Sequence, residues 1–358
     1  MSFETPSSGA RLANIQSLRG IAALLVVISH LLVIELKYSP DQLLGQSASL
    51  GMVGVDLFFA ISGFIMVHVI WQMGRGHRSA AEFLFARASR IYPLYWLVSA
   101  ALLAVYLWKP DIVFSSYDQP PNLIKSFLLY PDYRDPLLAV GWTLIHEIGF
   151  YLMIAPLLLL KRKFILPYLL IWGGVLSIGQ IVDYGYYLFS SKVLDLILSP
   201  LSYEFLAGGL AGWAYHRFNA AQAKPVFLGA AIIWICVLGF LIFQGRGMPL
   251  LPSHRALFFA VPSALLVYGL AGCSYKLPAY SQTLGNWSYA LYLTHILSLS
   301  VMGRLWHKFA SGSPWDNIPA LALMCIATIV IAGMVYKLAE KPMLTLAKSL
   351  RRRFFPPS

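Results

Sequence analysis

The sequence predicts an all-α fold, a polytopic integral membrane bundle of about ten transmembrane helices with both termini in the cytoplasm. Composition gives the first indication, because 58% of the 358 residues are hydrophobic and only 12% are charged, whereas soluble domains carry roughly 25% charged residues. The second indication is a series of apolar runs of roughly 20 residues, the length that crosses a bilayer. No polar segment of the size of a soluble domain separates these runs, so residues 1–358 are predicted to form a single integral-membrane domain.

The apolar runs are bounded by charged residues or by Pro and Gly, and their order predicts a topology. With the N-terminus in the cytoplasm, most Lys and Arg residues fall in inner loops and in a basic tail at about 339–358, as the positive-inside rule requires. The net charge of +12 is therefore explained by membrane orientation, and no nucleic-acid partner is predicted. The predicted helices are 18–36, 51–72, 91–108, 138–160, 164–182, 196–216, 226–244, 253–272, 286–306 and 317–338.

The first predicted helix carries Arg19 near its cytoplasmic end and His30 in its interior. At 100° per residue the two lie on one stripe of the helix, roughly 16 Å apart along its axis. Ionisable residues inside a membrane are costly and usually functional. Arg19 alone also fits a helix-end anchor, and His30 alone fits a core histidine bonded to a backbone carbonyl. Their shared stripe favours a functional channel.

The second predicted helix contains GMVGVDLFFAISGF, which places Asp56 within an apolar region. A carboxylate in that position needs a partner, for which a histidine or an arginine is the natural choice. Backbone N–H groups at a helix N-terminus are the alternative. Gly51, Gly54 and Gly63 flank Asp56 and are predicted to allow close helix packing.

The loop after the second helix, MGRGHRSAAEFLFARASRIYPLYW, is the densest basic cluster outside the tail. Arg87 and Arg90 are spaced i, i+3 and face the same way on a helix, with Arg75 and Arg78 upstream. Paired guanidiniums at a cytoplasmic membrane edge suit bidentate phosphate binding, although ordinary positive-inside topology also explains them. The tail KSLRRRFFPPS is interpreted as an inner-leaflet anchor held by anionic lipid.

The fourth predicted helix contains GWTLIHEIGFYL, with the pair His146–Glu147. The zinc-protease motif HExxH is absent, because position 150 is Phe and the second metal ligand is missing. Glu147 remains an intramembrane acid that requires a partner.

The ninth predicted helix reads LGNWSYALYLTHILSL and has a polar stripe on one face. Ser288, Tyr292 and His295 fall at i, i+4 and i+7, and Tyr289 lies beside them. An aromatic belt at the membrane interface would explain the tyrosines, but His295 within the stripe favours the lining of a cavity.

Several catalytic signatures are absent from the sequence. It has no P-loop, no dinucleotide-binding glycine motif, no nucleophile elbow and no cluster with metal-ligand spacing. These absences argue against ATP-driven transport, dinucleotide chemistry and serine hydrolysis, and no metal cofactor is predicted.

Five segments together resemble the membrane acyltransferase-3 family, and within it the exopolysaccharide O-acetyltransferases of the succinoglycan type. They span residues 15 to about 297 in the order that the family shows, and they are IQSLRGIAALLVVISH, GMVGVDLFFAISGFIM, FLFARASRIYPLYW, VGWTLIHEIGFYL and LGNWSYALYLTHI. The resemblance implies an Arg-x10-His element, matched by Arg19 and His30, and an Arg-x-x-Arg element, matched by Arg87 and Arg90. His146 departs from the pattern, since a smaller polar residue such as Asn is expected before the glutamate.

The resemblance also implies a ten-helix enzyme of the bacterial cytoplasmic (inner) membrane that uses a cytoplasmic acyl-CoA donor. We expect transfer of an acetyl group from acetyl-CoA to a hydroxyl of a lipid-linked or nascent polysaccharide, with His30 as general base. Asp56 or Glu147 would orient the imidazole. Phosphates would be held by Arg19, Arg87 and Arg90, and the acceptor path lined by Ser288, Tyr289, Tyr292 and His295.

Three alternatives remain open from the sequence. A proton-coupled transporter also uses intramembrane His, Asp and Glu. A second alternative keeps the family but changes the acceptor to a macrolide, a lipopolysaccharide O-antigen or a Nod-type oligosaccharide. The third is a non-catalytic component of a polysaccharide export complex, although a scaffold has little reason to keep buried ionisable groups.

Overall fold

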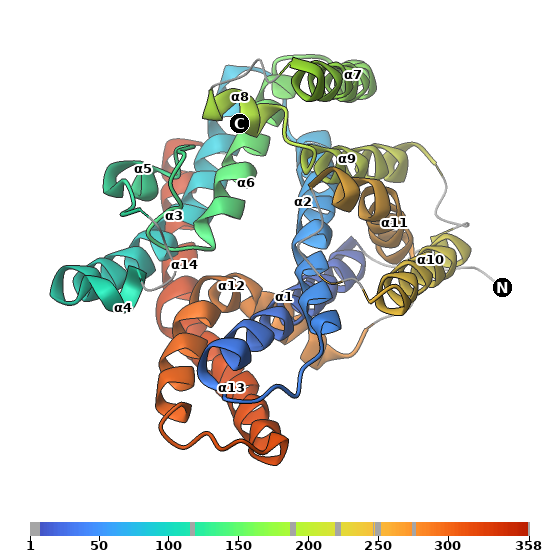
Figure 1. Cartoon of the computed structure of the whole chain (residues 1–358). Coiled ribbons are helices and arrows are strands. Elements are labelled where there is room, and N and C mark those ends of the chain that lie inside the picture. The colour runs from blue at the N-terminus through green and yellow to red at the C-terminus, as the bar shows by residue number, and fades with distance from the viewer. Residues whose placement is uncertain are drawn as a thin grey trace. The chain divides into compact units, whose positions relative to one another are not determined.

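The computed structural model describes residues 8–114, 119–186, 191–218, 223–245, 247, 252–273 and 277–356. Within these ranges the regular structure is entirely helical and no strand occurs (Figure 1), which confirms the predicted all-α class. Contacts divide the chain into two compact units. Unit 1 comprises Met1–His68 and Tyr203–Tyr336, and unit 2 comprises Val69–Ser202 and Lys337–Ser358. A single domain over 1–358 stays a prediction.

Unit 1 contains the first two long helices and most of the C-terminal half of the chain. Its core lies among α1, α2, α10 and α11, where Leu57, Phe64 and Phe259 are at most 2% exposed. The helices are α1 (Ser8–Tyr38), α2 (Val53–Gln72), α9 (Ser202–Arg217), α10 (Ala223–Phe243), α11 (Pro252–Gly272), α12 (Ala279–Trp306) and α13 (Pro314–Val335), with a 3₁₀ turn at Gln46–Met52 before α2.

Unit 2 contains the middle of the chain and the basic tail. The C-terminal helix α14 packs along α3, and α3 also contacts α6 (Figure 1). The helices are α3 (His77–Trp108), α4 (Pro110–Phe114), α5 (Leu123–Leu128), α6 (Gly141–Ile154), α7 (Ile165–Tyr186), α8 (Lys192–Ile197) and α14 (Lys341–Phe354).

Apolar side chains on the outside of the helices match a lipid environment. On α10, for example, Ile235 is 70% exposed and Phe243 is 88% exposed, while Trp234 is buried against the core. A helix that is hydrophobic all round and buries only one side is suited to a bilayer. The chain is therefore a multi-pass membrane protein.

Eight segments of the described chain are long and apolar enough to cross a membrane, against the ten predicted. The predicted spans 196–216 and 286–306 are absent from this set, although both regions are helical. Helix α9 has 16 residues and rises about 24 Å, less than a hydrocarbon core of about 30 Å. Helix α12 has 28 residues, but the polar stripe predicted on it reduces its hydropathy. The cytoplasmic placement of both termini stays a prediction.

Glycines bring α2 into close contact with its neighbours, as the sequence predicted. A Cβ built on Gly63 would lie 1.9 Å from the Phe205 carbonyl oxygen of α9. On Gly51 and Gly54 it would lie 2.1 Å and 2.2 Å from carbonyl oxygens of α1. Such distances exclude any side chain, so the helices approach through backbone atoms.

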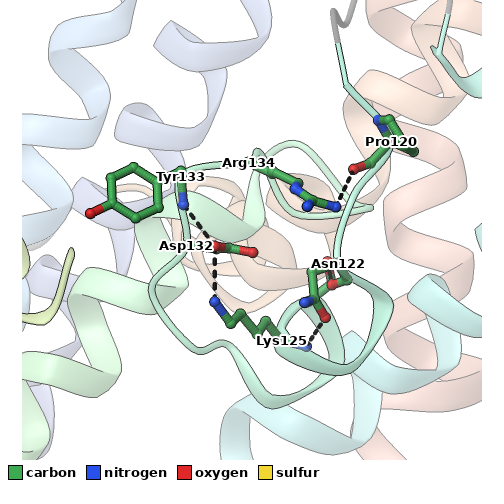
Figure 2. A network of polar contacts seen from close by, with 7 residues as sticks. Pro120, Asn122, Lys125, Asp132, Tyr133 and Arg134 are labelled. Atoms are coloured by element: carbon green, nitrogen blue, oxygen red, sulfur yellow. Dashed lines mark hydrogen bonds and ion pairs between the residues drawn. The ribbon is translucent and has the colours of Figure 1, made fainter. Parts of the chain in front are cut away.

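A small polar network organises the described part of the segment between α3 and α6 in unit 2 (Figure 2). Lys125 Nζ donates to Asp132 Oδ1 at 2.9 Å, and the Tyr133 amide donates to the same oxygen at 2.9 Å. The Asn122 side chain caps α5 by accepting from the Lys125 amide. The lysine and the amide together hold the pKa of Asp132 below its usual range, so the carboxylate is the form that closes this loop.

Candidate functional site

The packing of α1 against α12 in unit 1 brings His30 to His295. Their ring centroids are 4.8 Å apart and the rings meet edge to face at 76°. Gly285 allows this approach, because a Cβ there would lie 1.8 Å from the Gln16 carbonyl oxygen of α1. Two histidines that the sequence predicted on different helices therefore form one pair.

The hydrogen bonds of His30 define which ring nitrogen is available for chemistry. Nδ1 lies 2.8 Å from the Val26 carbonyl oxygen one turn earlier, and 3.4 Å from Ser29 Oγ. A carbonyl oxygen only accepts, so the neutral imidazole carries its proton on Nδ1 and has its lone pair on Nε2. This is the tautomer that a general base acting through Nε2 requires.

His295 is fully buried and has the same local arrangement. Its Nδ1 lies 2.8 Å from the Tyr292 carbonyl oxygen and 3.1 Å from that of Leu291, both on α12. Its Nε2 has no hydrogen-bond partner among the described residues. The tautomer argument used for His30 therefore also leaves a lone pair on this buried nitrogen.

The polar stripe on α12 is buried along its length. Ser288, Tyr289, Tyr292 and His295 are each at most 8% exposed. Ser288 Oγ is a second buried polar atom without a partner in the described ranges. The Tyr292 ring contacts those of Phe58 and His295, with centroids 5.9 Å and 5.7 Å away. Buried polar atoms normally have partners, so the unpaired atoms on this face are suited to a bound polar group.

Arg19 lies on the same helix as His30, toward its N-terminus, and is half-buried. Its Nη1 donates to Gln16 Oε1 at 3.4 Å. Gln16 Nε2 donates in turn to the Gly285 carbonyl of α12 at 2.8 Å. The guanidinium is thereby tethered where α1 and α12 are in closest contact.

Asp56 is paired with an arginine, as the sequence indicated, and that arginine is Arg255 of α11. Arg255 Nε donates to Asp56 Oδ1 at 3.0 Å and Nη2 to Oδ2 at 2.8 Å. Asp56 has no exposed surface and Arg255 is 8% exposed. Glu204 of α9, also fully buried, interacts electrostatically with both. The guanidinium is hydrogen-bonded to Asp56, and Glu204 lies close to this ion pair in the interior of unit 1.

Arg255 was not among the site residues predicted from the sequence, although a signal for it exists. It stands near the start of an otherwise apolar run, SHRALFFAVPSALLVYG. The rule that singled out Arg19 and Asp56 applies equally to this residue.

In unit 2 the predicted pair Arg87 and Arg90 lies near Glu147. Arg87 interacts electrostatically with Arg90, Glu147 and Tyr151, and its carbon Cζ lies 5.7 Å from the Phe83 ring centroid. Tyr151 donates from its hydroxyl to Glu147 Oε1. Arg87 Nε is buried and has no hydrogen-bond partner within the described chain. The structure thus groups Glu147 with the Arg-x-x-Arg element and adds Tyr151, which was not predicted from the sequence.

His146 is placed by a local contact. Its Nδ1 lies 3.0 Å from the Trp142 carbonyl oxygen one turn earlier on α6, and its ring meets that of Trp142 edge to face at 5.7 Å. This is the same local bond that His30 and His295 make, so it does not by itself distinguish a function for His146.

Comparison with known proteins identifies relatives over almost the whole chain. The family model described as an acyltransferase domain matches residues 12–337, a range that includes every predicted site residue. The chain is 28% identical to the exopolysaccharide production protein ExoZ of Rhizobium meliloti, over 86% of this chain and 94% of ExoZ. It is 24% identical to the acyltransferase MdmB of Streptomyces mycarofaciens, over 95% of this chain and 94% of MdmB.

A further relative is longer than this chain. The peptidoglycan O-acetyltransferase OatA of Listeria monocytogenes is 22% identical over 92% of this chain but only 55% of its own length. No solved structure matches the chain.

Proposed function

The chain belongs to the acyltransferase-3 family, and from that premise we propose that it is a membrane O-acyltransferase that modifies a polysaccharide. The donor is acetyl-CoA, and the acceptor is a sugar hydroxyl of a lipid-linked or nascent chain in the bacterial inner membrane. The relatives named for exopolysaccharide production and for peptidoglycan O-acetylation support this acceptor class. Eight segments suited to a bilayer support a membrane location.

The His30–His295 pair is the observation that carries the proposal. In this mechanism His30 Nε2 accepts the proton of the sugar hydroxyl, because Nδ1 is already donating to Val26. The hydroxyl oxygen then bonds to the carbonyl carbon of the thioester while the carbon–sulfur bond breaks. The imidazolium returns its proton to the thiolate that leaves, so the histidine is unchanged after each turnover.

The contacts of His30 support a backbone group in the orienting role. The carbonyl of Val26, rather than a carboxylate, bonds Nδ1 in the structure. Asp56 has both oxygens on Arg255, and Glu147 accepts from Tyr151. We therefore assign Asp56 to the internal ion pair of unit 1 and Glu147 to the electrostatic environment of Arg87.

The remaining residues divide between donor and acceptor. Arg87, Arg90 and Arg19 are assigned to the phosphates of the donor, and the unpaired Nε of Arg87 is suited to a phosphate oxygen. Ser288, Tyr289, Tyr292 and His295 are assigned to the acceptor. The aromatic faces of the two tyrosines suit a sugar ring, and the unpaired atoms Ser288 Oγ and His295 Nε2 suit its hydroxyl groups.

The test uses purified protein in lipid nanodiscs with radiolabelled acetyl-CoA and lipid-linked polysaccharide repeat units. We expect label to appear in the glycan and free CoA to be released in equal amount. A parallel sample without glycan measures hydrolysis of the donor. If acetyl-CoA stays intact while the protein carries protons across vesicles, the transporter alternative replaces this proposal.

A further inference from the structure

A strongly basic pocket lies in unit 2, outside the groups assigned to the reaction. It has a volume of about 770 Å³ and is formed by the loop before α3, the first two turns of α3, the C-terminal helix α14 and the two residues after α14. Its charged lining consists of Arg75, Arg78, Lys348, Arg351, Arg352 and a single acid, Glu82. Five cations around one cavity repel one another unless an anion is present.

The tail is fixed to α3 by specific contacts, so the pocket has defined walls. Arg351 Nη2 lies 2.8 Å from Glu82 Oε1, and Arg78 Nη2 donates to the Pro356 carbonyl at 2.8 Å. Phe85 of α3 packs against Phe354, with ring centroids 6.1 Å apart. The tail is therefore packed on α3. The sequence predicted a contact with anionic lipid for this tail, but not a contact with the protein.

Arg351 and Arg78 already hold the tail against α3, and the other cations of the pocket are available to a ligand. Lys348 and Arg352 are exposed on α14 and form no ion pair in the described part of the chain. They contribute charge that Glu82, already bonded to Arg351, does not neutralise. The pocket therefore keeps a net positive charge.

Arg75 gives a second, independent indication of an anion. Its Nη1 donates to the Leu157 carbonyl at 2.9 Å, but Nε and Nη2 are buried without a partner among the described residues. Nε and Nη2 form the edge of a guanidinium that grips a carboxylate or phosphate bidentately, as Arg255 grips Asp56. Burial and the nearby Arg162 lower the pKa of Arg75, and a bound anion would offset this shift by stabilising the charged guanidinium.

We propose that this pocket binds a phosphate-bearing ligand through Arg75, Lys348 and Arg352, with α14 as one wall. Two sources carry the same chemistry. One is the nucleotide end of the acyl donor. This source rests on the proposed function, and it is supported by the nearness of Arg351, in the pocket, to Arg87, which is assigned to the donor. The other is the headgroup of an anionic phospholipid, which would lie beside a membrane-edge helix.

The experiment compares two matched double variants of the full-length protein. Lys348→Gln with Arg352→Gln removes two charges from the pocket and leaves Arg75, which also holds a backbone carbonyl, in place. Lys341→Gln with Arg353→Gln removes two exposed charges of the same helix that do not line the pocket. Both variants are first checked for wild-type thermal unfolding.

Binding is measured without turnover, so its result is separable from that of the transfer assay. The first arm titrates adenosine 3′,5′-bisphosphate, with inorganic phosphate as a simpler probe, into protein in nanodiscs of neutral phosphatidylcholine. The second arm measures enrichment of phosphatidylglycerol around the protein in mixed micelles. Because the pocket variant loses two of the cations that would contact the phosphate, we expect its affinity to fall about tenfold or more.

Each result decides the matter. Loss of bisphosphate binding in the pocket variant alone identifies the nucleotide source, and loss of phosphatidylglycerol enrichment alone identifies the lipid source. If the pocket variant and its control bind both probes as the wild type does, or lose them equally, the proposal is wrong.

Discussion

The buried ion pair of unit 1 yields a prediction about stability. Replacing Arg255 with Met removes the guanidinium that both oxygens of Asp56 contact and with which Glu204 interacts. Methionine has a similar reach and no charge, so the change isolates the electrostatic contribution. Asp56, which has no exposed surface, is left without a cation.

The expected magnitude differs between the two partners of the pair. Removing one member of a buried ion pair costs about 3–5 kcal/mol, because the other charge remains buried and uncompensated. Arg255→Met should fall in this range. Asp56→Asn should cost less, about 1–3 kcal/mol, because Glu204, without the neighbouring Asp56 charge, can ionise and serve as the counter-charge of Arg255.

The assay is reversible unfolding of the purified protein in detergent micelles, followed by tryptophan fluorescence. Arg353→Met serves as the control, since an exposed arginine of α14 should change stability by no more than about 0.5 kcal/mol. The double variant Asp56→Asn with Arg255→Met should lose less than the sum of the single losses. An Arg255→Met protein as stable as the control would refute this description of the interior.

Three further predictions follow from packing, charge and pH. Gly63→Ala should destabilise the protein by about 1–3 kcal/mol, because its Cβ would overlap a carbonyl of α9. Gly229→Ala, with open space around it, should instead stabilise the protein by about 0.5–1 kcal/mol. Equal effects of the two changes in unfolding experiments would contradict the packing argument. Arg87→Lys should raise the KM for acetyl-CoA about tenfold with little change in kcat, since lysine lacks the bidentate fork; an unchanged KM removes Arg87 from the donor site. Asp132→Asn should cost no more than about 1 kcal/mol at pH 7 because its pair is near the surface. Because the pKa of Asp132 is lowered in the folded protein, its stabilising contribution is complete only above the ordinary carboxyl pKa of about 4. The contribution is lost as pH falls through the lower pKa of the folded protein. A stability difference between wild type and Asp132→Asn that persists at strongly acid pH would contradict this prediction.

The membrane architecture followed from the sequence because length and hydropathy are local properties. The runs that became α1, α2, α10 and α11 needed only an apolar stretch of sufficient length. The same reasoning was weakest for α12, where the polar residues that lower hydropathy are the ones assigned to the acceptor. It was also weak for α9, which is too short to span by itself.

The sequence predicted most of the residues of the site, but it did not predict which of them contact one another. Asp56 was expected to need a cation, yet its partner lies 199 residues away, a separation over which no periodicity operates. Likewise, the stripe on α12 was visible by helical spacing, but its meeting with His30 depends on the packing of α1 through Gly285. Val26 contacts His30 through its backbone carbonyl, and such a contact cannot be predicted from the type of side chain at that position.

The most direct test of the central claim measures acetyl transfer by His30→Gln, with His307→Gln as the matched control. His307 is bonded through Nδ1 to the Tyr38 carbonyl and has no assigned role in the reaction. General-base catalysis contributes about 10²–10⁴ in rate. We therefore expect kcat of the folded His30→Gln protein to fall by that factor while its affinity for acetyl-CoA and the activity of the control are retained. Transfer by His30→Gln at the wild-type rate would contradict the account.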